Sequence, residues 1–144
     1  MKRVYLAGPI ENLSWTETSD WRVRSEMILL DNQILPINPL RGKMILTGTK
    51  KIESDGKFFP KEIVGRDRND VTSCDVVLMN LHGINNYYIG TFVELGWADM
   101  LRIPVVIVLD KDNEKRKHPF IQELSYAIVE TLDEAIDKVL EILK

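Results

Sequence analysis

Short apolar runs alternate along the chain with longer segments in which apolar and polar residues are mixed. Five runs are short and apolar enough to be buried strands, at residues 3–7, 33–37, 75–81, 105–109 and 127–129. The longest of them are continuously apolar, which is typical of parallel strands that are covered on both faces. Gly8-Pro9 ends the first run and Pro39 follows the second, as expected where a strand gives way to a loop. The pattern therefore predicts about five parallel strands.

The mixed segments between these runs have the spacing and the terminal residues of helices. Ser14 and Glu17 fit a capping box that opens the first helix, and Thr131 opens the last in the same way. Apolar residues recur along the first helix at roughly helical spacing, at Trp21, Val23, Met27, Ile28 and Leu30. The remaining helices are expected at residues 60–73, 90–102, 120–125 and 131–143.

Strands that alternate with helices in this way form a doubly wound parallel sheet with right-handed crossovers. The predicted fold class is α/β: a single domain over residues 1–144, with a Rossmann- or flavodoxin-like sheet of about five strands and helices on both faces. Ligands of such folds bind outside the carboxyl ends of the strands, where the strand order reverses. This places Gly8-Pro9-Ile10 and the loop 82–90 at one rim.

Two segments are expected to be loops. Residues 38–58 include Arg41-Gly42-Lys43 and carry no clear periodicity; a loop that long in a compact domain is usually functional or mobile. The run from Lys111 to Lys117 alternates in charge, and its simplest interpretation is a solvated loop.

Composition narrows the function classes. The chain has 144 residues, 44% of them hydrophobic and 28% charged, which describes an ordinary globular protein. A net charge of −3 gives no electrostatic footprint for a nucleic-acid polymer. The single cysteine, Cys74, lies between a helix and a strand that both look buried, so it is interpreted as an inert core thiol. No apolar run reaches membrane-spanning length, and we expect a cytoplasmic protein with no membrane partner.

Two carboxylates stand out because each occupies a position where an apolar residue is expected. Glu94 lies just inside a helix, behind Gly90-Thr91, and is flanked by apolar residues. Desolvation and positioning can make such a carboxylate a nucleophile, although it could instead stabilise the positive end of the helix dipole. Asp67 occupies a core-facing stripe with Ile63 and Val71, where a carboxylate is costly unless it is paired or faces a cavity.

An ion pair of Asp67 with Arg66, Arg68 or Arg22 is one explanation of that position. The other is a cleft carboxylate that works opposite Glu94. Two carboxylates in different environments are the usual means of breaking a glycosidic bond, one acting as nucleophile and the other as acid. On this hypothesis, burial would raise the pKa of Asp67 so that it can protonate the departing group.

Three motifs in order resemble the nucleoside 2-deoxyribosyltransferase family, which also contains nucleoside 5′-monophosphate N-glycosidases. They are Val4-Tyr5-Leu6-Ala7-Gly8-Pro9-Ile10, Asp67-x-x-x-Val71-x-x-Cys74-Asp75 and Gly90-Thr91-x-x-Glu94-Leu95-Gly96-x-Ala98, and the resemblance covers roughly residues 3 to 110. It implies a small Rossmann-like enzyme that cleaves an N-glycosidic bond and works as a homo-oligomer, a dimer or larger. It also implies that Glu94 is the nucleophile, that Asp67 acts on the base, and that Tyr5 hydrogen-bonds near the nucleophile.

The remaining candidate site residues are assigned to substrate binding. They are Gly8, Pro9, Ile10, Tyr88, Gly90, Thr91, Arg41 and His118. Arg41 could hold a 5′-phosphate or belong to a solvated basic turn. His118 is the nearest match to a polar residue with which a neighbouring subunit of the family completes the sugar site, and its alternative is a surface histidine. Tyr5 could equally be a core aromatic.

The sequence departs from the family at two places that bear on the substrate. Tyr87-Tyr88 stands where several transferases have an aspartate that reads the base, so the base preference is left open. The first loop, Glu11-Asn12-Leu13-Ser14, is acidic, whereas the monophosphate glycosidases have a basic, glycine-rich loop there. We therefore expect a transferase that exchanges the base of 2′-deoxynucleosides through a glycosyl-glutamate intermediate.

A monophosphate N-glycosidase, a non-catalytic nucleotide-binding module and a structural oligomer subunit are the alternatives. The expected partners are a nucleoside or nucleotide and a free nucleobase. Double displacement needs no cofactor, and Cys74, His82 and His118 show no metal-ligand spacing, so neither a cofactor nor a metal is predicted.

Overall fold

The computed structural model describes residues 1–42 and 59–144, and it shows one five-stranded parallel sheet. In chain order the elements are β1 (Arg3–Ala7), α1 (Trp15–Asp31), β2 (Leu35–Ile37), α2 (Pro60–Thr72), β3 (Val76–Asn80), α3 (Ile89–Met100), β4 (Val105–Val108), a 3₁₀ turn η1 (Glu114–Lys117), α4 (Pro119–Leu124), β5 (Ala127–Val129) and α5 (Leu132–Leu143). The strand order is β2-β1-β3-β4-β5 and every pair is parallel. The predicted α/β doubly wound class is confirmed.

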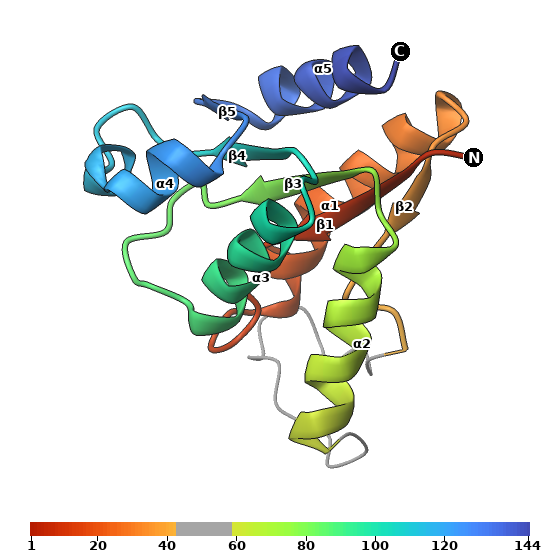
Figure 1. Ribbon diagram of the computed structural model, residues 1–144, viewed down its shortest axis with the longest axis horizontal. Coiled ribbons are helices and arrows are strands. Elements are labelled where there is room, and N and C mark those ends of the chain that lie inside the picture. The colour runs from red at the N-terminus through yellow and green to blue at the C-terminus, as the bar shows by residue number, and fades with distance from the viewer. Residues whose placement is uncertain (43–58) are drawn as a thin grey trace.

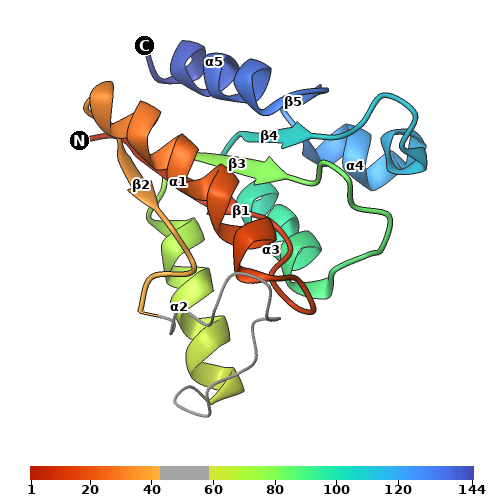
Figure 2. The ribbon, with the colours of Figure 1, turned by 180° about the vertical axis from the view of Figure 1, so that it is seen from behind.

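Helices cover both faces of the sheet. Figures 1 and 2 show α2, α3 and α4 on one face, with α1 and α5 on the other. The side chains of β1 alternate between two cores: Tyr5 and Ala7 join the core under α3, whereas Val4 and Leu6 join the core under α1 and α5. The alternation points Tyr5 toward the helix that carries Glu94.

The chain reverses its direction of winding between β1 and β3, which are neighbours in the sheet. From β1 the chain proceeds to β2 on one side, and from β3 it proceeds to β4 on the other. In doubly wound sheets the loops that follow two such strands diverge at the carboxyl edge, and ligands bind in the crevice between them. Residues 8–14 follow β1 and residues 81–88 follow β3, so both loops lie at this edge of the sheet.

The local starts of helices follow the sequence signals. The Thr131 hydroxyl accepts a hydrogen bond from the Glu134 amide, and the Glu134 carboxylate accepts one from the Thr131 amide, so the capping box at α5 is complete. At α1 the Ser14 hydroxyl accepts from the Glu17 amide. These bonds satisfy amides that the first helical turn leaves without an intrahelical partner.

Two expectations are corrected. The face of α1 that meets the sheet is formed by Thr18, Arg22, Ser25 and Leu29, while Val23, Met27 and Leu30 of the predicted apolar set are exposed. The segment Lys111–Lys117 is not simply a solvated loop: Glu114–Lys117 form a 3₁₀ turn in which Lys115 is buried. Most of the predicted 38–58 loop, including Lys43, lies outside the described residues.

Candidate active site

Glu94 and Tyr5 meet in the core between β1 and α3. The Tyr5 hydroxyl donates a hydrogen bond of 2.9 Å to Glu94 Oε1. Tyr5 is fully buried and Glu94 is only 7% exposed. Glu94 shares the buried face of α3 with Thr91, Leu95 and Ala98, so the helix directs this carboxylate inward and away from bulk water.

The surroundings keep the Tyr5 hydroxyl protonated. Burial raises the pKa of Tyr5 far above its ordinary value, and the nearby charges of Glu94 and Asp67 raise it further. Tyr5 is therefore a permanent donor to Glu94 at neutral pH. A donor fixed on one oxygen orients the Glu94 carboxylate.

Asp67 comes to the same place from α2, which packs against α3. Its charge raises the pKa of Tyr5, so the two groups are electrostatic neighbours. Burial differs along the predicted stripe of α2: Val71 is buried, whereas Ile63 and Asp67 are half-buried. Both carboxylates that the sequence singled out therefore act electrostatically on Tyr5, from two helices that pack against each other.

Gly8 lies where the backbone of the first loop passes closest to its neighbours. A Cβ atom there would come within 3.0 Å of the Asn80 carbonyl oxygen and 3.1 Å of the Trp21 ring. Pro9 beside it is buried and Ile10 is half-buried. This packing therefore favours glycine at position 8, whatever ligand the loop approaches.

Arg22 is a buried cation beneath this loop, and sequence reasoning considered it only as an ion-pair partner of Asp67. Its guanidinium donates to three backbone carbonyls, those of Leu6 at 3.1 Å, Thr18 at 2.7 Å and Gly8 at 3.0 Å. It therefore ties the end of β1 to the first turns of α1. Burial lowers the pKa of Arg22 to about 10, while the neighbouring Tyr5 and Glu94 oppose that shift, so Arg22 stays charged at neutral pH.

The sequence feature that could have indicated a buried Arg22 is its position along the helix. Arg22 falls in line with Thr18, Ser25 and Leu29 on one side of α1, and small side chains at Thr18 and Ser25 leave room for a long one between them. The apolar residues of α1 conceal this register because they lie mainly on other sides of the helix.

The start of α3 supplies the opposite rim. Tyr88 is the half-buried N-cap residue, and its carbonyl accepts from the Phe92 amide at 3.2 Å. Gly90 is exposed, and a Cβ atom there would meet nothing within 4 Å. Thr91 is buried behind it. The helix therefore begins next to the crevice, with open space at its second residue.

Two other predicted residues have contacts of their own. Arg41 forms a 2.6 Å ion pair with the buried Asp70 of α2, which fastens the end of the β2 loop to that helix. His118 is the exposed N-cap of α4, and its Nδ1 accepts from the Phe120 amide at 3.2 Å. Figures 1 and 2 place α4 on the side of α3 away from α2, so the fold does not bring His118 next to Asp67 within one chain.

Cys74 is a core residue, as its place in the sequence indicated. It is 7% exposed, its thiol donates to the Val71 carbonyl at 3.2 Å, and burial raises its pKa to about 12. Within residues 1–42 and 59–144, no three His, Cys, Asp or Glu side chains gather as a metal site would need. No helix of this described part is long and apolar enough to cross a membrane.

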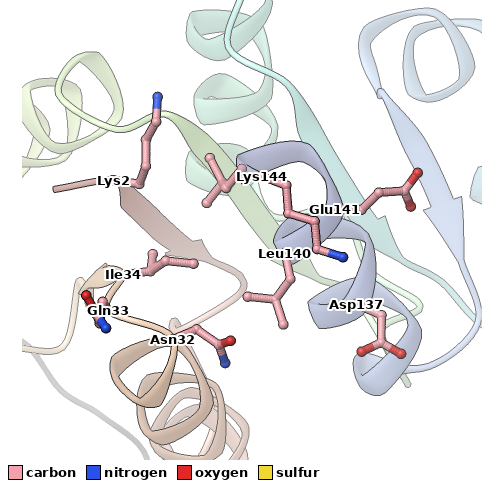
Figure 3. Close-up of a pocket in the computed structure, with 9 residues that line it drawn as sticks. Lys2, Asn32, Gln33, Ile34, Asp137, Leu140, Glu141 and Lys144 are labelled. Atoms are coloured by element: carbon pink, nitrogen blue, oxygen red, sulfur yellow. The ribbon is translucent and has the colours of Figure 1, made fainter.

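A surface hollow of about 690 Å³ lies at the other end of the sheet (Figure 3). Lys2, just before β1, and Asn32-Gln33-Ile34, just before β2, line one side of it, and α5 lines the other. These residues mark the amino edge of the strands. The hollow contains none of the candidate residues and is separate from the crevice at the carboxyl edge.

The family of the chain follows from sequence comparison. The family model described as nucleoside 2-deoxyribosyltransferase matches residues 4–133, and the chain belongs to this family. No curated protein matches the chain significantly. The motifs that carried the resemblance, around Tyr5, Asp67 and Glu94, all lie within the matched residues.

Solved structures share the fold at low sequence identity. A conserved protein from Enterococcus faecalis V583 has a TM-score of 0.70 and 18% identity, with 98% of each chain covered. The 2-deoxyribosyltransferase of Bacillus psychrosaccharolyticus has a TM-score of 0.68 and 20% identity, with 94% of this chain and 90% of that chain covered. The CMP N-glycosidase of Clostridium botulinum has a TM-score of 0.61 and 18% identity, with 97% and 99% covered. Enzymes named for two different reactions therefore share this architecture.

Proposed function

We propose that the protein is a pentosyltransferase that exchanges the base of 2′-deoxynucleosides through a covalent glycosyl-glutamate intermediate. The observation that carries the proposal is the buried hydrogen bond from Tyr5 to Glu94, with Asp67 as an electrostatic neighbour of the pair. A buried, oriented carboxylate beside a second carboxylate on a separate helix suits a double displacement. Membership of the family supports the same chemistry.

In the first half of the reaction, a Glu94 oxygen attacks the anomeric carbon of the sugar. The bond between that carbon and the base nitrogen breaks, and its electron pair leaves with the base. Asp67 supplies the proton that the departing base takes up, and the sugar remains as an ester of Glu94. The hydrogen bond from Tyr5 holds the Glu94 carboxylate in place during this attack.

In the second half, a nitrogen of the incoming base attacks the same carbon and displaces the Glu94 carboxylate. The proton released from that nitrogen returns to Asp67, and both residues regain their starting states. If water attacked instead, the products would be the free sugar and the free base, and the enzyme would be a hydrolase.

The first loop favours free nucleosides over monophosphates. Glu11 and Asn12 are exposed at the rim of the crevice, and a carboxylate there repels a phosphate by about 1 kcal/mol at close range in water. Arg41, the other residue considered for holding a phosphate, forms an ion pair with Asp70. Both features support a neutral 5′ end on the substrate.

We also infer that the working form is a homo-oligomer built on α3. Ile89, Val93 and Met100 are 85%, 41% and 81% exposed, and helical spacing places them along one stripe opposite the buried face of the helix. A helix that is apolar on both sides is normally covered on both. A second copy of the chain that covers this stripe would lie beside the helix that carries Glu94, where a residue of that copy such as His118 could complete the site.

One incubation tests the reaction. The protein is mixed with deoxyinosine and free adenine, and the products are separated by chromatography, with a parallel incubation of deoxyadenosine monophosphate. We expect deoxyadenosine and hypoxanthine from the first mixture. Free base without base exchange would indicate a hydrolase. A catalytic efficiency at least about tenfold higher on deoxyadenosine monophosphate than on deoxyadenosine, without base exchange, would establish the N-glycosidase alternative. Thermal stabilisation by nucleosides without turnover would indicate a binding module.

A further inference from the structure

Lys115 is a buried cation that joins two loops at the carboxyl edge of the sheet. It belongs to the turn η1 and is only 3% exposed, although it lies within a run of charged residues. Its ammonium donates to the carbonyls of Ile84 at 3.1 Å and Asn85 at 2.7 Å, both in the loop that follows β3. A buried ammonium is costly unless its donors are satisfied, and these carbonyls satisfy two of the three.

The same ammonium lies over an aromatic ring. Lys115 Nζ is 4.8 Å from the centroid of the Tyr87 ring, within the range of a cation–π interaction. Tyr87 in turn packs against Phe92 in the first turn of α3, with the ring centroids 5.6 Å apart. A continuous path of contacts therefore runs from Lys115 through Tyr87 to the helix that carries Glu94.

Other contacts between the two loops act in the same direction. Asn113 donates to the Ile84 carbonyl at 3.0 Å, and the Gly83 amide donates to the Asp110 carboxylate at 2.8 Å. His82 Nδ1 lies 2.7 Å from the other Asp110 oxygen. The segment after β4 thus holds the segment after β3 at several points, and Lys115 makes the contacts closest to α3.

We propose that Lys115 is a positioning residue that fixes the loop 82–88, and with it Tyr88 and the start of α3, at the rim of the active site. The loop contains no helix or strand, so its backbone would otherwise sample many conformations. Lys115 does not need to touch the substrate: it raises the fraction of molecules in which the rim is ready to bind. The effect on catalysis rests on the proposed function, whereas the effect on the loop does not.

The test compares Lys115→Met with Lys117→Met. Methionine keeps the apolar stem of Lys115 but removes its charge and its three donors. Lys117 lies in the same turn, its side chain is 80% exposed and its ion-pair partner is the exposed Glu114, so it is the matched control. The Ile84 carbonyl keeps the Asn113 donor and the exposed Asn85 can turn to water, so we expect Lys115→Met to fold.

Two measurements are made on both variants. Hydrogen exchange followed by mass spectrometry should show peptides covering 82–89 exchanging at least about tenfold faster in Lys115→Met, and unchanged in Lys117→Met. In base exchange, KM should rise about tenfold in Lys115→Met while kcat stays within about twofold, because a smaller binding-competent fraction weakens apparent affinity without altering the bound complex. A general loss of packing would also speed hydrogen exchange in the strands of the sheet.

Each outcome decides a separate point. An unchanged rate of hydrogen exchange over 82–89 in Lys115→Met would show that Lys115 does not fix the loop. Faster hydrogen exchange over 82–89 with an unchanged KM would overturn the positioning role. If the wild-type protein cleaves no nucleoside, the proposed function fails, while the exchange comparison still decides whether Lys115 holds the loop.

A second variant covers the case in which Lys115→Met does not fold. Lys115→Gln keeps two N–H donors but removes the charge over Tyr87, so we expect exchange of 82–89 to be about threefold faster or more. An unchanged exchange rate in Lys115→Gln would then overturn the proposal.

Discussion

Burial is the reason why Tyr5 and Glu94 need each other as hydrogen-bond partners. A buried carboxylate that lacks a donor is strongly unfavourable, and a buried phenol needs a partner for its hydroxyl. The 2.9 Å hydrogen bond between them satisfies both requirements. Tyr5 is thus a core residue that also provides a hydrogen-bond donor to Glu94.

Replacement of Glu94 should remove the chemistry without removing the fold. Glu94→Gln keeps the size of the side chain and an oxygen that can accept from Tyr5, but an amide is a very poor nucleophile. We expect the rate of base exchange to fall by about a thousandfold or more, with an unfolding midpoint close to that of the wild type. Activity above about a tenth of the wild-type rate would contradict the assignment.

A trapping experiment locates the nucleophile directly. Incubation with a 2-fluoro-2-deoxynucleoside should leave a sugar ester on Glu94, which mass spectrometry of peptides can identify. A label on another residue would move the nucleophile there.

Asp67 should act on the leaving group, and its effect should therefore depend on the base. Asp67→Asn cannot supply a proton, so poor leaving groups should be slowed most and activated ones much less. We expect the ratio of wild-type to variant kcat/KM to differ by about tenfold or more between the two kinds of substrate. An equal loss on all substrates would show that Asp67 has a structural role, such as the ion pair that the sequence also allowed.

At the scale of elements, Asp75 fastens the start of β3 to the start of β1. Its carboxylate accepts from the Arg3 amide at 2.8 Å and from the Lys2 ammonium at 3.2 Å. Partial burial raises the pKa of Asp75, but these two donors outweigh it and hold the pKa below the usual value. A group whose pKa is lower in the folded state stabilises the protein above its unfolded pKa, and that stability is lost as the pH falls through the folded pKa.

Asp75→Asn should accordingly destabilise the protein at neutral pH and have a smaller effect in acid. The side chain is about one-third exposed and its ionic partner is more exposed, so solvent screening keeps the expected cost to about 1 kcal/mol or less. Urea unfolding at pH 7 and near pH 3 measures the difference from wild type, with Asp112→Asn, in an exposed turn, as the control for loss of a charge. A difference that does not shrink in acid would contradict the mechanism.

At the scale of the whole molecule, the apolar stripe on α3 predicts assembly. Val93→Glu places a charge in the centre of the stripe and should shift the protein toward the monomer in analytical ultracentrifugation. If the partner completes the site, base exchange should fall with the loss of assembly. Val23→Glu is the matched control, because Val23 is 49% exposed on α1, on the other face of the sheet. Dissociation by Val23→Glu alone would move the interface to α1, and a monomeric wild type would contradict assembly altogether.

The family assignment is likewise a property of the whole chain. Residues 4–133 match the family model, yet the three solved structures compared above are at most 20% identical and include both a transferase and an N-glycosidase. At that identity the architecture is shared, while the reaction depends on a few side chains around the crevice. The base-exchange experiment therefore tests what the family alone leaves open.

The sequence by itself was enough to predict the strands and the helix starts and to select the two carboxylates as candidates. Continuous apolar runs predicted five strands, and all five observed strands lie within or match the predicted ranges, because strands covered on both faces have few alternatives. Glu94 could be recognised because its sequence neighbours are apolar, and Asp67 because it interrupts an apolar helical stripe. Helix starts at Ser14 and Thr131 were visible because capping is decided within four residues.

Only the tertiary structure decided what Arg22 and Lys115 do. Both are charged residues in segments where charge is ordinary, and their partners are backbone carbonyls, which every sequence position supplies equally. The carbonyls of Gly8 and Leu6 lie 14 and 16 residues from Arg22, and those of Ile84 and Asn85 lie 31 and 30 residues from Lys115. Local patterns record which side chains avoid water, whereas the contacts of a buried cation depend on which loops the sheet order brings together.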